Sequence, residues 1–114
     1  MAGKKTVLIS AYTAGANIEE YRFLKVTGDY TLAHASAGSY AVGVSEGTAK
    51  AGERIDVMHL GIAEVIVGTG GVSAGGAVES DANGKAVALD EGIALGIALE
   101  SGAVGDIISI LIKG

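Results

Sequence analysis

The sequence predicts an all-β protein, a small β-barrel or sandwich of short antiparallel strands with an extended N-terminal arm. Short runs rich in Val, Ile and Leu recur along the chain, and Gly, Asp and Asn bound them. Nineteen glycines interrupt almost every window that is long enough for a helix. The chain has no proline, which favours uninterrupted strand pairing.

A weak internal two-fold repeat supports this prediction. When the sequence is shifted by 53 positions, residues 30–61 align without a gap on residues 83–114, with seven identities. Each copy contains the pattern G-(E/D)-x-I-x-(V/I) near its end. Two copies are too few for a solenoid, which needs about three repeats or more. A pseudo-symmetric small barrel or sandwich is therefore expected.

The first half of the chain contains a candidate arm followed by short strands. Residues 6–12 have strand composition but lie outside the aligned repeat, so residues 1–17 are predicted to form an N-terminal arm and residues 18–114 a single β domain. Further strands are expected at residues 21–26, 30–35, 40–45 and 53–60. In the last of these, Ile55, Val57 and His59 alternate with residues of the opposite face.

The second half continues the pattern. Gly61 is predicted to kink or bulge the chain before a strand at residues 62–67. Residues 68–76 are expected to form a long surface loop with a short element around Val72. The D-A-N-G turn at residues 81–84 precedes three more expected strands. These strands are residues 85–89, 93–99 and 106–113.

Composition narrows the class of protein. A chain of 114 residues is expected to form one domain, but one Phe, four Tyr and no Trp supply few large anchors for a core. Association with a partner is therefore expected to supply part of the stability. The net charge of −5 argues against direct binding to nucleic acid. The apolar runs are too short for a membrane span or a signal peptide, so synthesis in the cytoplasm is expected.

The sequence offers no motif for catalysis. His34 and His59 have no neighbouring residues at metal-ligand spacing, so both are expected to have structural roles. The absence of cysteine excludes a thiolate site. No G-x-S-x-G nucleophile elbow is present, and the glycine-rich residues 70–76 lack the Lys-Ser/Thr pair of a P-loop. We therefore expect no enzyme activity, no catalytic residue, no metal and no cofactor.

Four segments in order carry a resemblance to a known family. They read YRFLKVTGD, YAVGVSEGTAKAGERIDVMHLGIAEVIVG, GGAVESDANGKAVAL and GIALESGAVGDIISILIKG. This chain resembles the capsid cement, or head decoration, proteins of tailed phages. The resemblance implies a homo-oligomer, a trimer more than a dimer, that binds the major capsid protein on the outside of an icosahedral head and stabilises the shell. It also implies a virion protein that is present in the host cytoplasm during assembly.

The N-terminal segment is the expected contact with the capsid or with a neighbouring subunit. It is apolar and strand-like, and an added strand on a sheet edge would satisfy its backbone groups. The residues expected to make this contact are Thr6, Val7, Leu8, Ile9 and Tyr12.

Two other classes of protein compete with this interpretation. The first is a small β-barrel module that binds a ligand or a carbohydrate, and the four tyrosines are its only candidate aromatic platforms. All four lie in the N-terminal part of the chain, which disfavours a sugar site built from several loops. The second is a small enzyme, which the absence of catalytic motifs disfavours further.

Overall fold

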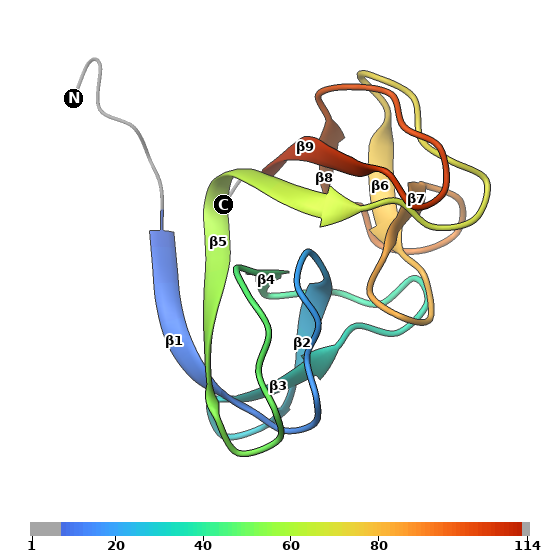
Figure 1. Ribbon diagram of the computed structural model, residues 1–114. Helices are drawn as coiled ribbons and strands as arrows, with labels where there is room; N and C mark the ends of the chain where they lie inside the picture. Colours follow the sequence, from blue (N-terminus) through green and yellow to red (C-terminus); the bar gives the residue numbers. More distant parts are fainter. Residues whose placement is uncertain (1–7, 113–114) are drawn as a thin grey trace.

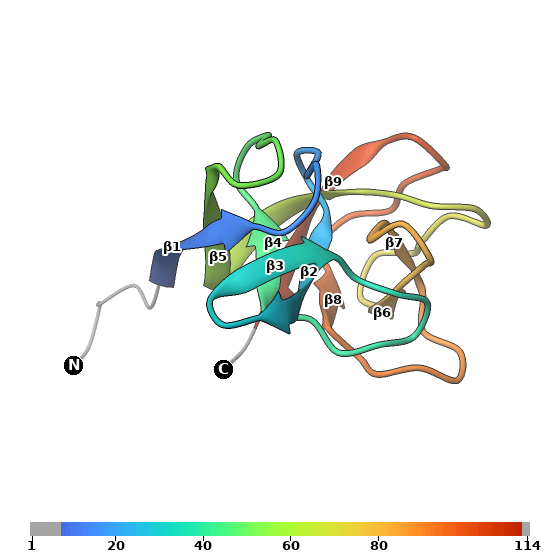
Figure 2. The same cartoon turned by 90° about the horizontal axis from the view of Figure 1, so that it is seen from below.

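The chain folds into two small β-barrels that lie side by side and share one long strand (Figures 1 and 2). The computed structural model describes residues 8–112, and these residues contain nine strands and no helix, which confirms the all-β prediction. The strands are β1 (Leu8–Ala14), β2 (Phe23–Gly28), β3 (Thr31–His34), β4 (Gly43–Ser45), β5 (Arg54–Ile66), β6 (Ala77–Ser80), β7 (Ala86–Ala88), β8 (Gly96–Ala98) and β9 (Ile107–Ile112).

The first barrel consists of β1, β3, β2, β4 and residues 54–60 of β5, in that order around a closed ring. β1 closes the ring, because it pairs in parallel with β3 and antiparallel with β5. Its interior is filled by small and branched apolar side chains, among them Ile18, Leu24, Leu32, Ile55 and Val57.

The position of β1 changes the predicted domain boundary. Residues 8–14 of the expected arm form a barrel strand, which pairs with β5 from Leu8 to Thr13 and with β3 at Thr13 and Ala14. Residues 1–7 of that expected arm lie outside the described residues. The division into an arm of residues 1–17 and a domain of residues 18–114 therefore does not follow the strand pairing.

The second barrel consists of residues 61–66 of β5 followed by β9, β8, β6 and β7. A parallel bridge between Val67 and Ala86 brings the end of β5 back to β7 and completes the ring. The interior of this barrel belongs to a second apolar cluster, which also includes Phe23, Val44 and Met58 from the first barrel. The two barrels are thus joined by shared core packing as well as by the chain.

Gly61 marks the passage from one barrel to the other within β5. Its φ of 106° lies in the left-handed region, which glycine adopts with little steric cost. Figure 1 shows β5 running along β1 and then turning to run along β9. The predicted kink is therefore confirmed, and one continuous strand replaces the two that the sequence predicts around it.

The predicted repeat is present in the strand pairing, and it is longer than the sequence alignment indicates. The Val44–Met58 pair of the first barrel corresponds to the Ile97–Leu111 pair of the second at the same shift of 53 positions. The pairing of β1 with β5 likewise corresponds to that of β5 with β9. The hairpin of β2 and β3 corresponds to that of β6 and β7 at a shift of 54, so the second copy has one extra residue before β6 and one residue fewer between β7 and β8. The ungapped alignment is therefore one position out of register over β3.

Candidate interaction surfaces

The residues expected to make the contact do not all lie on one exposed surface. Thr6 and Val7 fall outside the described residues. The backbone of Leu8 pairs with Leu60 of β5, and the Ile9 side chain is 48% exposed. Of the expected residues that the structure describes, Ile9 is therefore the one whose side chain is shown to be available to a partner.

Tyr12 has a structural role inside the first barrel. Its hydroxyl lies 2.9 Å from Nε2 of His59, and Nδ1 of His59 lies 2.7 Å from the carbonyl oxygen of Val42. Because a carbonyl oxygen can only accept, Nδ1 carries a proton, and Nε2 of the neutral ring accepts from the Tyr12 hydroxyl. This chain of bonds ties β1 to the segment that precedes β4, as expected for a structural histidine.

A groove lined mainly by apolar side chains, which we call the junction groove, lies where the two barrels meet. Equivalent residues of the two copies contribute to its lining, at the shift of 53 positions. The first copy contributes Tyr40, Ala41, Val42 and His59, and the second contributes Ile93, Ala94, Leu95 and Ile112. The groove has a volume of about 300 Å³, and it continues past Ala94 and Leu95 into a hollow of about 220 Å³ lined by Ile97 and Leu111.

Hydrogen bonds between the two connecting loops hold the junction groove in shape. The backbone nitrogen of Ile93 donates to the Gly38 carbonyl at 3.0 Å, and that of Gly38 donates to the Ser80 carbonyl at 2.8 Å. In the second copy, Oε1 of Glu79 accepts from the backbone nitrogens of Asp90 and Gly92 at 2.7 and 2.9 Å. The loops beside the groove are therefore tethered to the strands.

The first barrel carries a polar cluster near the start of β2. Arg22 is buried and forms an ion pair with Glu19 at 3.3 Å, while the backbone nitrogen of Glu19 donates to Nε2 of His34 at 3.0 Å. Ser45 is fully buried, and its hydroxyl donates to the Glu19 carbonyl and accepts from the Arg22 backbone. Burial lowers the pKa of His34, and the nearby Arg22 charge lowers it further, against a smaller opposing effect of Glu19.

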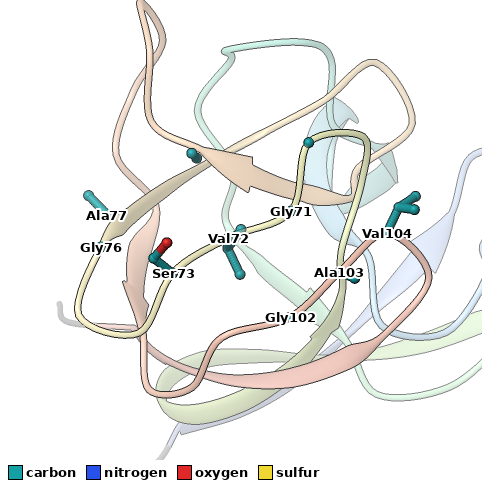
Figure 3. Close-up of a pocket in the computed structure, with 10 residues that line it drawn as sticks. Gly71, Val72, Ser73, Gly76, Ala77, Gly102, Ala103 and Val104 are labelled. Carbon is teal, nitrogen blue, oxygen red and sulfur yellow. The ribbon is translucent and has the colours of Figure 1, made fainter.

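The corresponding place in the second barrel is an open hollow of about 570 Å³ (Figure 3). At the shift of 54 positions, Ser73, Gly76 and Ala88 of its lining replace Glu19, Arg22 and His34. None of the residues that line the hollow is charged. The two barrels thus share a backbone plan and present different surfaces at this point.

Acidic side chains gather beside the start of β2 and along β5. Burial raises the pKa of Glu46, and the carboxylates of Glu64, Asp56 and Glu20 add to this effect. Glu20 is also the main cause of the raised pKa of Tyr21. Nevertheless, residues 8–112 contain no group of three or more His, Asp or Glu side chains placed to hold a metal ion. Over the same residues, no helix is long and apolar enough to cross a membrane.

Comparisons with known proteins identify the family. The model of the phage cement protein family matches residues 2–114, which confirms the resemblance found in the sequence. The crystal structure of the head fiber gp8.5 N base in bacteriophage phi29 has a similar fold, with a TM-score of 0.79 and 23% identity over 95% of each chain. No curated protein matches this chain significantly. The chain therefore belongs to the phage cement protein family and is a structural protein of a phage head.

Proposed function

We propose that this chain is a decoration subunit, which binds the outer surface of an icosahedral phage head and stabilises the shell. The family match over residues 2–114 is the observation that carries this proposal. Membership in a structural family also favours the expectation that the chain is not an enzyme. A protein that binds only the assembled shell stabilises that shell by mass action, because binding shifts the equilibrium away from dissociated capsid subunits.

The proposed partners are the major capsid protein and other copies of this chain, with a trimer as the proposed oligomer. The start of β1 remains the proposed contact, through Ile9 and the neighbouring residues Thr6, Val7 and Leu8. Tyr12 would support this contact from inside the barrel, through its bond to His59. Leu8 pairs with Leu60, which lines the junction groove, so a contact at β1 would adjoin that groove.

The proposal predicts a fixed copy number on mature heads. Particles from cells infected with the phage that encodes this chain would be banded on a density gradient, and the chain quantified against the major capsid protein. We expect a constant ratio of this chain to the major capsid protein, set by the symmetry of the lattice. We also expect protease added to intact heads to digest the chain. A chain that stays at the top of the gradient, or that resists protease until the heads are opened, would contradict decoration of the outer surface.

A further inference from the structure

We propose that the junction groove is the surface that docks on the capsid shell, against apolar side chains accompanied by lysines or arginines. This inference rests on the proposed function and adds to it the docking face and the chemistry of the shell surface that this face binds.

Large apolar side chains are exposed in the groove and in the hollow that continues it. Tyr40, Ile93 and Ile97 are 49%, 52% and 36% exposed, although all three are large and apolar. No charged side chain lines the groove or the hollow that continues it. Removal of apolar surface from water is favourable, and contiguous exposed apolar patches mark interaction sites.

The charge beside the groove indicates the chemistry of the partner surface. Glu79, Asp90 and Glu91 line a hollow beside Gly92, the residue that precedes Ile93 in the groove. Residues 61–112 contain seven acidic side chains and one lysine, whereas residues 8–60 contain six acidic and four basic side chains. An apolar surface with an acidic border is complementary to an apolar surface with a basic border.

The same charges argue against a two-fold dimer of this chain built on the groove. A two-fold dimer built on the groove would place the same patch on both partners. The acidic border of one copy would then face that of the other, and like charges placed against each other disfavour an interface. A basic shell surface has no such penalty.

The groove also needs little rearrangement to bind. Its loops are held by the Ile93–Gly38 and Gly38–Ser80 backbone hydrogen bonds, and Nζ of Lys25 lies 2.5 Å from Oγ of Ser36 in the first loop. A surface that is already ordered loses less conformational entropy on association. The groove is thus suited to bind a preformed shell.

The test uses purified full-length protein added to DNA-filled heads from a phage that lacks this gene. Ile93→Asp places a charge in the groove, and we expect it to weaken binding at least about tenfold. Tyr40→Asp tests the part of the lining that the first copy contributes in the same way. Val104→Asp is the matched control, because Val104 is 63% exposed, lies in the same barrel and does not line the groove. Circular dichroism tests whether each variant is folded, and gel filtration measures its oligomer size.

A second arm of the test examines the charges. Raising the salt concentration should weaken wild-type binding, because screening reduces attraction between opposite charges. The double variant Asp90→Asn with Glu91→Gln should bind more weakly at low salt and depend less on salt. A salt dependence equal to that of the wild type would overturn the proposed basic border.

The outcomes separate this inference from the proposed function. If the wild-type protein does not bind the heads, the proposed function fails. If the wild type binds and the folded Ile93→Asp and Tyr40→Asp variants bind equally well, the groove is not the docking face. If either variant changes the oligomer size of the free protein, the groove is a contact between copies, and the inference is also overturned.

Discussion

His34 shows how single residues make the two barrels differ. In the first barrel its ring accepts a hydrogen bond from the Glu19 backbone beside the buried Arg22. In the second barrel the equivalent position is Ala88, at the edge of an open hollow. Sequence reasoning found both histidines and gave them structural roles, but it did not find the polar cluster. The members of that cluster are separated in sequence, and only the pairing of β2 with β3 and β4 brings them together.

The lowered pKa of His34 predicts a dependence of stability on pH. Between the folded pKa and the unfolded value of 6.5, the unfolded chain binds more protons than the folded chain. The contribution of His34 to the free energy of unfolding is therefore complete above this pH window, and it is lost as the pH decreases through the window. His34→Gln keeps an acceptor for the Glu19 nitrogen and does not titrate. We expect its urea midpoint to fall less than that of the wild type between about pH 7.5 and about pH 5; parallel curves would contradict the prediction.

At the scale of strands, equivalent glycines allow equivalent close approaches. A Cβ atom on Gly43 of β4 would collide with the Met58 carbonyl oxygen, and one on Gly96 of β8 would lie 2.8 Å from the Leu111 carbonyl oxygen. Met58 and Leu111 are themselves equivalent residues of the two copies. The same packing requirement therefore applies twice, once in each barrel.

This equivalence predicts that Gly43→Ala and Gly96→Ala both destabilise the protein. Each added methyl group must displace backbone, and we expect each variant to lower the free energy of unfolding by about 1–3 kcal/mol. Gly47→Ala is the control, because no atom lies within 4 Å of its added Cβ, and a change within about 0.5 kcal/mol is expected. Urea denaturation would measure all three. A neutral effect of both Gly43→Ala and Gly96→Ala would contradict the close packing of these strands.

Most strands could be predicted from the sequence, and the exceptions have physical causes. β6 was not among the predicted strands, because A-V-E-S is short and half polar, and its extended form depends on pairing with β7 and β8. The barrel role of β1 was also missed, although Ile9 and Gly15 fall on Ile62 and Gly68 at the shift of 53 positions. Two identities in so short a segment are a weak signal. The pairing of β1 with β3 and β5 shows that β1 is the first-barrel counterpart of residues 61–66 of β5.

At the scale of the whole molecule, two barrels with equivalent strand arrangements form a slab with extents of 38 × 35 × 22 Å. The junction groove could not be predicted from the sequence, because it forms only where Y-A-V-G and I-A-L-G, 53 positions apart, come together. Each segment alone indicates a short buried strand. The acidic excess of the second barrel was present in the composition, but its relation to a surface required the fold.

A reconstruction of DNA-filled heads by electron cryomicroscopy, with and without this chain, tests the central claim most directly. The account predicts that the difference density lies on the outer surface, fits the two-barrel fold, and has the junction groove facing the shell. Difference density inside the head, or heads that look identical with and without the chain, would contradict its role as a decoration subunit. Density on the outer surface with the groove facing solvent would retain that role and contradict the docking face.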